Sequence, residues 1–276
     1  MSTDENGYGD LADTNESEIE TEPNEAADPQ GVVENKIPAD LRGKYEFLSY
    51  RNAAIILSET HPAEFNDLSE ALRSFHISTD MIRKAGGNES EIPKFIAASL
   101  RPLGWHETII QGDLKVRLTW RKQVGKTKTG KPIFESEFRE TTRKRYLDGH
   151  KIDFVKRRVA FDMEWNSKDQ TFDRDLYAFN AFFLSGVIDV GVLLTRGESL
   201  NPVLKQLGQA KNKNGEPEYK TVRGVKVPRM THEKYGASTT WWGKLVYRLN
   251  AGRNGGCPVL AIGITAACID DWPHVT

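Results

Sequence analysis

The amino-acid sequence predicts an α/β domain in which helices cover a mixed β-sheet. Apolar residues first recur at helical spacing over residues 63–100, and from Trp105 onwards they alternate with polar residues in strand-sized stretches. Beyond residue 173, helical stretches alternate with wholly apolar segments that are short enough to be buried strands. Strands that lead into a strand–helix–strand unit, with helices on the N-terminal side, are typical of this fold class.

Acidic residues are concentrated at the N-terminus. Residues 1–36 hold 11 Asp and Glu but a single basic residue, Lys36. We predict that this segment is a disordered acidic tail, because it has too little apolar surface to bury, and that residues 37–276 form the folded domain. Subtracting the tail from the chain totals of 39 acidic and 38 basic residues leaves 28 and 37 for the domain. A basic domain is expected to bind a polyanion, and the tail either has no function or competes for the basic surface.

Two helices are predicted ahead of the strands. The first spans residues 63–85 and stops at Gly86-Gly87, and the second begins at Asn88, a good N-cap residue, and runs to Leu100. Pro93 lies in the first turns of the second helix, where proline is tolerated. A helix–glycine–helix pair is either a DNA-reading motif or ordinary core packing, and both interpretations stay open.

The strands and helices of the catalytic half follow over residues 105–265. Strands are predicted at 106–121, 133–146, 151–155 and 159–165, with turns at Gly130, Asp148-Gly149 and 156–158. The next elements are a helix at 173–184, a buried strand at 187–194, a helix at 199–207, a loop or hairpin insertion at 210–225, a helix from Ser238 to Leu249 and a strand at 257–264.

Composition excludes several classes of protein. A chain of 276 residues makes one large domain or two small ones. No apolar stretch approaches the roughly 18–20 residues that span a bilayer, and the N-terminus lacks the pattern of a secretory signal. The two cysteines, Cys257 and Cys268, are too few for a disulfide scaffold and lack zinc-site spacing. We therefore expect a reduced cytoplasmic protein with no membrane partner.

Basic residues gather in the strand region. Residues 115–158 contain fifteen Lys and Arg against five acids, and Lys126, Lys128 and Lys131 fall on a predicted hairpin tip. Such a tip suits contacts with DNA phosphates, which give affinity without sequence information. The alternative is a solvated basic face without a partner.

Three carboxylates lie within this basic region. Asp153 is at the end of one short strand, and Asp162 and Glu164 are two residues apart on the next, so their side chains leave the same face. Val159, Phe161, Met163 and Trp165 point to the opposite, apolar face. Three close carboxylates repel one another unless a cation compensates them, and hard oxygen ligands favour Mg²⁺. The alternative is that these acids form salt bridges with nearby Arg and Lys.

The same residues resemble a known family. Ile152-Asp153-Phe154, Lys156-Arg157 and Asp162-x-Glu164 are similar to the PD-(D/E)xK nuclease signature as it occurs in BglII-like type II restriction endonucleases. Later segments that resemble the family are 172–176, 191–196 and 234–240, so the resemblance covers roughly residues 60–265. It implies a restriction-endonuclease-like mixed central sheet flanked by helices, and Mg²⁺-dependent cleavage of double-stranded DNA with as many as two ions per active site.

One position departs from the family pattern. Glu164 stands where most of the superfamily has Lys, although some restriction enzymes of this group have Glu or Gln there. A water that loses its proton would then pass it to solvent, to Glu164 or to a substrate phosphate. Two other arrangements stay open: the motif could be Glu164-Trp165-Asn166, or Lys168 could reach in from the end of the strand.

Further candidate residues are weaker. The resemblance implies an additional acidic residue near the end of the helix at 88–100, which Glu107 would supply; otherwise Glu107 is an exposed residue at a strand start. His150 and Arg157 flank Asp153 and are candidates for DNA contacts. Hydroxyls at a helix N-terminus can clamp a phosphate, and Arg and Asn read base edges. These rules add Ser238, Thr239, Arg253 and Asn254 as candidate DNA-binding residues, although capping and turn formation explain them equally well.

These observations predict a Mg²⁺-dependent endodeoxyribonuclease that cuts both strands of a short palindromic site. A twofold-symmetric site presents two equivalent scissile bonds, so a homodimer is expected. A restriction enzyme also requires a DNA methyltransferase that protects the host DNA, without a stable complex between the two. The alternatives are a repair or junction-resolving nuclease of the same superfamily, and a DNA-binding protein whose acidic site is degenerate.

Overall fold

The core of the protein is a six-stranded mixed sheet, which confirms the predicted α/β class. A computed structural model describes residues 26–84 and 90–273. In spatial order the strands are β1 (Tyr45–Tyr50), β8 (Val259–Ile264), β5 (Val190–Arg196), β4 (Val159–Glu164), β3 (Pro132–Lys156) and β2 (His106–Lys126). β4, β5 and β8 run parallel to one another, and the other neighbours pair antiparallel. The most buried strands therefore lie at the centre of the sheet, as apolar parallel strands do.

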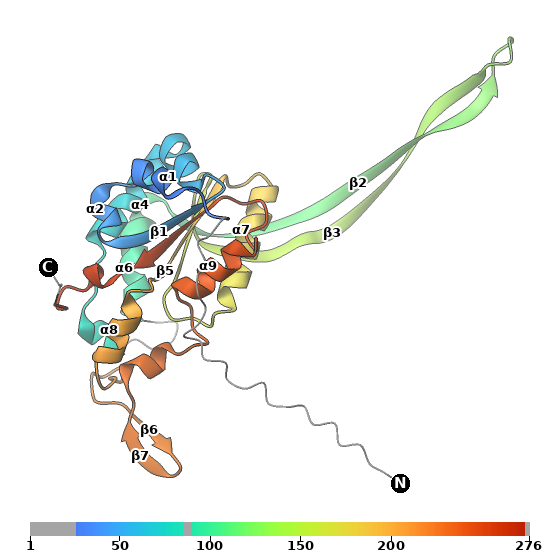
Figure 1. Ribbon diagram of the computed structural model, residues 1–276. Coiled ribbons are helices and arrows are strands. Elements are labelled where there is room, and N and C mark those ends of the chain that lie inside the picture. The colour runs from blue at the N-terminus through green and yellow to red at the C-terminus, as the bar shows by residue number, and fades with distance from the viewer. Residues whose placement is uncertain (1–25, 85–89, 274–276) are drawn as a thin grey trace, which may run out of the picture.

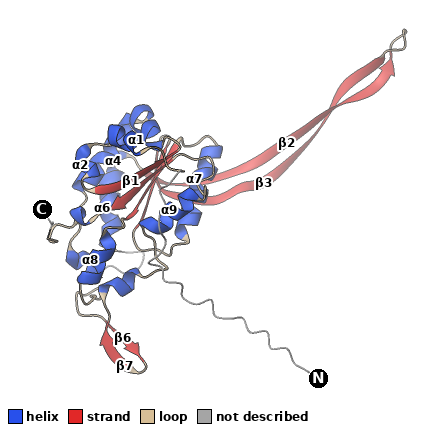
Figure 2. Cartoon of the chain, viewed as in Figure 1, coloured by secondary structure: helices blue, strands red, loops and turns tan. Residues whose placement is uncertain are grey.

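Two layers of helices bury the two faces of this sheet (Figures 1 and 2). On one face, α7 (Thr171–Leu184) and α9 (Trp242–Asn250) pack on Ala160, Leu193 and Ala261. The opposite face, which carries Phe161 and Leu194, is covered by another set of helices. These are α1 (Gln30–Lys36), α2 (Ala39–Arg42), α4 (Pro62–Ser74), α5 (Thr79–Lys84), α6 (Glu91–Leu100) and α8 (Leu200–Gln206). Alternate residues of each central strand thus enter different cores.

Four short segments complete the body. A helical stretch follows β1 as α3 (Ala53–Ile55) and a π-helical turn at Ile56–Thr60. Single 3₁₀ turns occupy Arg101–Leu103, Thr231–Tyr235 and Ala266–Cys268. In residues 26–84 and 90–273, no helix is both long and apolar enough to cross a membrane.

The outer strands β2 and β3 continue beyond the body as a long two-stranded ribbon (Figure 1). The predicted turn at Asp148-Gly149 is wrong, because β3 runs through it from Pro132 to Lys156. Gly149 has a positive φ of 78°, and the pairing with β2 shifts register beside it. A bulge of this kind uses the same residue types as a turn, which explains the error.

The N-terminal predictions need two corrections. The predicted tail extended to residue 36, but α1 spans Gln30–Lys36 and buries Val33 against the core. Residues 1–25 lie outside the described residues, as do Gly86-Gly87 and Asn88. The helix predicted at 63–85 is interrupted after Ser74, because Ile77 pairs in parallel with Ile269 before α5 begins.

Two C-terminal predictions also change in detail. The loop or hairpin insertion predicted at 210–225 overlaps a hairpin that extends to Pro228. Its strands are β6 (Tyr219–Val222) and β7 (Val225–Pro228), and Arg223-Gly224 forms the turn between them. The helix predicted from Ser238 begins only at Trp242, so Ser238 does not cap it. The predicted helices at 173–184 and 199–207 and strands at 187–194 and 257–264 are confirmed to within a few residues.

Candidate active site

Strand β4 carries two acidic side chains into the interior. Asp162 and Glu164 are only 4% and 7% exposed, because β4 lies between β3 and β5 and beneath α7. Phe161 and Met163 point to the other core, as the alternation of the sequence predicts. Both carboxylates therefore leave the α7 side of the sheet.

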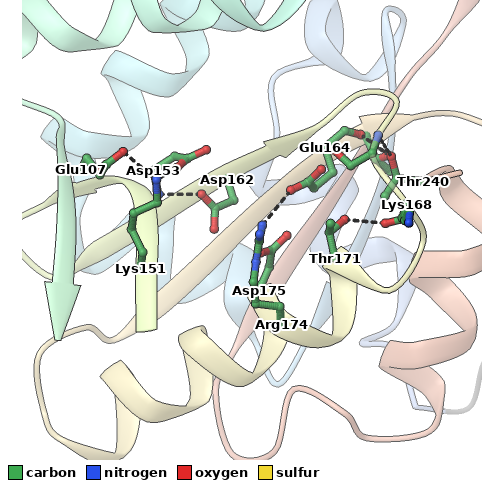
Figure 3. A network of polar contacts seen from close by, with 12 residues as sticks. Glu107, Lys151, Asp153, Asp162, Glu164, Lys168, Thr171, Arg174, Asp175 and Thr240 are labelled. Atoms are coloured by element: carbon green, nitrogen blue, oxygen red, sulfur yellow. Dashed lines mark hydrogen bonds and ion pairs between the residues drawn. The ribbon is translucent and has the colours of Figure 1, made fainter. Parts of the chain in front are cut away.

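Asp153 lies on β3 directly across from Asp162. Phe154–Lys156 of β3 pair with Val159–Phe161 of β4, which places Asp153 and Asp162 at the next position of the ladder. The backbone N–H of Asp153 donates to Oδ1 of Asp162 at 2.8 Å. The side chain of Asp153 is half exposed, and Lys151 Nζ lies 3.7 Å from its Oδ1. Lys151 also binds Glu107 at 2.9 Å, which holds the pKa of Glu107 below its ordinary value. Figure 3 shows Glu107, Lys151, Asp153 and Asp162 side by side.

Helix α7 adds a fourth carboxyl group that the sequence analysis did not single out. Asp175 is 1% exposed and lies beside Glu164 (Figure 3). Burial, together with the neighbouring Glu164, raises the pKa of Asp175 to about 8. Arg174 bridges the pair: its Nη2 is 2.8 Å from Oδ1 of Asp175 and 3.4 Å from Oε1 of Glu164. The only available signal was that 172–176 resembles the family, since spacing along the chain does not connect a helix residue with β4.

We call Asp153, Asp162, Glu164 and Asp175 the acidic cluster. Burial raises the pKa of Asp162 well above its ordinary value, and Asp175, Asp153 and Glu164 raise it further. The other three carboxyl groups are therefore close enough to Asp162 to disfavour its charge. Arg174 and Lys151 balance part of that charge, so the salt-bridge alternative holds in part for Glu164 and Asp153.

The donor chemistry of the acidic cluster fits a hard divalent cation. All its donors are carboxylate oxygens, and the buried Oδ2 of Asp175 has no hydrogen-bond partner among the described residues. In residues 26–84 and 90–273, however, no three His, Cys, Asp or Glu side chains are already grouped to hold a metal ion. A bound ion would draw the carboxylates of Asp153, Asp162 and Glu164 toward one point.

A cleft of about 540 Å³ opens beside the acidic cluster. Its walls include Lys151, Asp153, Glu164 and Arg174, and polar residues of the loop after β4 extend it. Asn166 and Lys168 are among those loop residues, so both alternative arrangements of the motif stay open. The cleft thus combines cations, which can contact a phosphate, with the carboxylates.

Buried Arg196 fixes the loop that forms this wall. Its guanidinium donates to the backbone oxygens of Trp165 and Thr240 at 2.8 and 2.6 Å and to the hydroxyl of Thr239 at 2.7 Å. Thr239 in turn donates to the backbone oxygen of Gly236. Its hydroxyl therefore has a structural role, whereas Ser238 is exposed near the cleft loop, where its carbonyl accepts from Asp169.

The other candidate DNA contacts lie at separate places. The ring of His150 packs on Tyr177 at 4.7 Å, and Arg157 is exposed in the turn before β4, at the opposite end of that strand from Glu164. Arg253 forms an ion pair with Asp173. Asn254 is a correction: it is 2% exposed and its amide donates to the carbonyl of Cys257, so it cannot read a base in this conformation. Lys126, Lys128 and Lys131 lie at the end of the β2–β3 ribbon, far from the acidic cluster.

A comparison with known families gives one match. The family described as restriction endonuclease BglII/BglIII matches residues 45–264, which is most of the chain. These limits coincide with the first residue of β1 and the last residue of β8, so the match spans the whole central sheet. No curated protein matches the chain.

Proposed function

We propose that this chain, which belongs to the BglII/BglIII restriction endonuclease family, uses Mg²⁺ to cut both strands of double-stranded DNA at a short palindromic site. Family membership makes it a restriction endonuclease, and hence a nuclease that acts on double-stranded DNA. The observation that supports the metal and the site is that Asp153 and Glu164 line one cleft with Lys151 and Arg174, while buried Asp162 accepts from the backbone N–H of Asp153 next to them.

The residues of the cleft divide into three roles. Asp153, Asp162 and Glu164 would hold the ion, whose charge polarises a phosphate oxygen and makes a water a better nucleophile. Arg174 and Lys151 would orient the scissile phosphate, because both are cations at the rim of the cleft. Asp175 would hold Arg174, whose guanidinium also reaches Glu164. Glu107 positions Lys151, and the proton of the attacking water leaves to solvent, to Glu164 or to the phosphate.

The partners follow from the symmetry of the substrate. One cleft cuts one strand, so a palindromic site calls for two copies related by a twofold axis. Host DNA would need protection by a companion methyltransferase that acts on the same sequence. Neither the second copy nor the methyltransferase needs to bind the cleft itself.

Substitution of Asp153 tests the proposal. We expect Asp153→Ala to abolish cleavage of plasmid DNA with Mg²⁺ while duplex binding stays within about threefold, because its side chain acts on the ion and not on the duplex. Asp148→Ala is the matched control: it removes an exposed aspartate from the same strand, outside the residues that line the cleft, and should cut normally. Full cleavage by Asp153→Ala would refute the assignment.

A second candidate function is DNA binding without cleavage. It is favoured by Glu164 in the place of the usual Lys and by the ion pair that Arg174 already makes with Glu164. Binding without any nicking, with either Mg²⁺ or Mn²⁺, would support it. A repair or junction-resolving nuclease would instead cut only damaged or branched DNA, whereas a restriction enzyme gives discrete fragments of intact plasmid.

A further inference from the structure

The β2–β3 ribbon has no obvious role in a single copy of the chain. From Gly112 and Leu147 outward it leaves the body, and we call residues 112–147 the arm (Figures 1 and 2). Gly112 to Lys126 spans about 45 Å at the usual rise per residue of a strand. An isolated pair of strands is at best marginally stable in water, because neither face is buried. The length of the arm therefore calls for a partner surface.

One face of the arm carries an apolar stripe. The register pairs Leu114 with Arg143, Val116 with Thr141, Leu118 with Arg139 and Trp120 with Glu137, and residues paired in this way share a face. The four apolar side chains, which we call the stripe, are 36%, 36%, 58% and 44% exposed, in order along β2. Contiguous exposed apolar residues of this kind mark a contact with another molecule.

The opposite face of the arm has a different character. It carries Lys115, Arg117 and Arg121 on β2 against the single acid Glu140 on β3, which pairs with the first two. Phe134 and Phe138, which are 50% and 61% exposed, share this face, and the guanidinium of Arg117 lies over the ring of Phe138. Three lysines follow at the tip, at positions 126, 128 and 131. A DNA duplex, as a polyanion, would contact this face and the tip, which leaves the stripe for an apolar partner.

We propose that the stripe packs against the stripe of a second copy of this chain, in an antiparallel arrangement centred on Leu118. This inference rests on the homodimer of the proposed function and names its contact. A twofold axis at Leu118 brings Leu118 onto itself and Val116 onto Trp120 of the second copy, so these three residues of the stripe are complementary to themselves, and Leu114 lies opposite Lys122.

The charges along the arm fit the same arrangement. At the axis the two copies of Arg139, the β3 partner of Leu118, face each other, and on either side Glu135 lies opposite Arg143 of the second copy. The two pairs of opposite charge outnumber the single like-charge contact. Neither Glu135 nor Arg143 forms an ion pair within the described part of the chain, and Arg143 contacts only the ring of Tyr146. Opposite charges thus meet twice per dimer, and they would select the antiparallel register over a parallel one.

This pairing carries each tip to the other copy. The axis at Leu118 places Lys126 next to Ile110 of the second copy, and Lys131 next to its Leu147. Along β3, the tip is then about 20 Å from the other copy's Asp153, against about 70 Å from its own. The tip lysines would therefore contact DNA at the active site of the other copy.

Sedimentation velocity of the full-length protein tests the contact. Leu118→Asp should raise the dissociation constant of the dimer on the order of 100-fold, because each dimer loses two buried leucine contacts. Thr119→Asp, which adds the same charge to the opposite face, should leave the dimer intact. If the Leu118→Asp protein stays dimeric, the stripe contact is overturned, whereas the proposed homodimer is not. If that dimer also binds DNA more weakly than the wild type, the stripe is a DNA contact. A wild-type protein that is monomeric at every concentration also overturns the proposed homodimer.

Charge reversal tests the register independently of folding. Glu135→Arg and Arg143→Glu should each weaken the dimer about tenfold, and the double reversal should restore it. Double reversal without any restoration would overturn the antiparallel register.

Mixing two inactive variants tests the action in trans. One variant is Asp153→Ala, and the other has Lys126, Lys128 and Lys131 replaced by Ala. In the mixed dimer the intact active site faces the intact tip of the other copy, so the mixture should nick supercoiled plasmid at least tenfold faster than either variant alone. No gain on mixing, with mixed dimers shown to form, would overturn the role in trans.

Discussion

Replacement of Asp175 by Asn offers the sharpest test of the acidic cluster, because it can be measured without DNA. Asp175 is 1% exposed, and its pKa of about 8 in the folded protein compares with 3.8 for the free group. At pH 7 the folded state must therefore take up a proton that the unfolded chain releases. The cost is about 4 kcal/mol, from 1.36 kcal/mol for each of the roughly three pH units between 3.8 and 7.

Asn has the same shape as Asp but needs no proton. Its amide is uncharged beside Glu164 at every pH, and its oxygen can still accept from Arg174. We expect Asp175→Asn to stabilise the metal-free protein at pH 7 by about 2–4 kcal/mol. A raised pKa contributes stability that is complete below about pH 4 and lost as the pH rises to about 8. The advantage of the variant should therefore shrink by about 3 kcal/mol between pH 7 and pH 5.

Urea denaturation in EDTA at both pH values measures this difference. The control is Asp173→Asn, a substitution on the same helix that should change the free energy of unfolding in the opposite direction. Burial raises the pKa of Asp173, but hydrogen bonds from Arg248 and Arg253 outweigh burial and leave its pKa below the ordinary value. Asp173→Asn should therefore lose stability at pH 7. An Asp175→Asn protein that is less stable than the wild type at pH 7, or whose advantage is the same at pH 5, would refute the convergence of Asp175 with Glu164.

Three further predictions test the metal, the loop and the tip. Mg²⁺ at 100 times its dissociation constant should stabilise the wild type by about 2.7 kcal/mol and should not stabilise Asp162→Asn. Equal shifts of the thermal midpoints of the two proteins would argue against Asp162 as a metal ligand. Arg196→Met leaves the carbonyls of Trp165 and Thr240 without their buried donor and should cost about 2–4 kcal/mol in denaturant unfolding; a loss below about 1 kcal/mol would contradict this. Replacing the three tip lysines by Ala should reduce the slope of log affinity against log salt by about 2.7, measured by fluorescence anisotropy, since each phosphate contact contributes about 0.9; an unchanged slope would remove the tip from the DNA contact.

The sequence predicts those parts of the fold that depend on local periodicity. The alternation of Asp162 and Glu164 with Phe161 and Met163 placed the carboxylates on one face of β4, and the structure has them there. Gly149 shows the limit of such patterns. A glycine with positive φ serves a turn and a bulge equally, and only the pairing of β3 along its whole length with β2 decides between them. Val33 shows another limit, since the segment predicted to be a disordered tail includes a helix that buries this side chain in the core.

The site was predictable where its residues lie on adjacent strands and not where they come from a helix. Asp153 and Asp162 are opposite one another because the two-residue turn Arg157-Arg158 joins β3 to β4. The sequence predicted a turn at this place, over 156–158, and the structure makes it one residue shorter. Asp175 reaches the same place only because α7 packs across β4, which no spacing in the chain reveals. The prediction that Asn254 contacts DNA was wrong for a related reason: the turn folds inward, and the side-chain amide of Asn254 donates to the carbonyl of Cys257.

The position of Arg174 bears on the departure at residue 164. Most of the superfamily carries a lysine there, and Glu164 reverses that charge. The guanidinium of Arg174 nevertheless lies 3.4 Å from Oε1 of Glu164, while its stem leaves the neighbouring helix. A cation therefore remains beside the third motif position, although it comes from α7 and not from β4. Because Asp175 also holds this guanidinium, at 2.8 Å, the charge is fixed in place whether or not a metal ion is bound. If Asp162 and Glu164 are the motif residues, as proposed, Glu164 changes which element supplies the cation and leaves a cation paired with the carboxylates at the cleft.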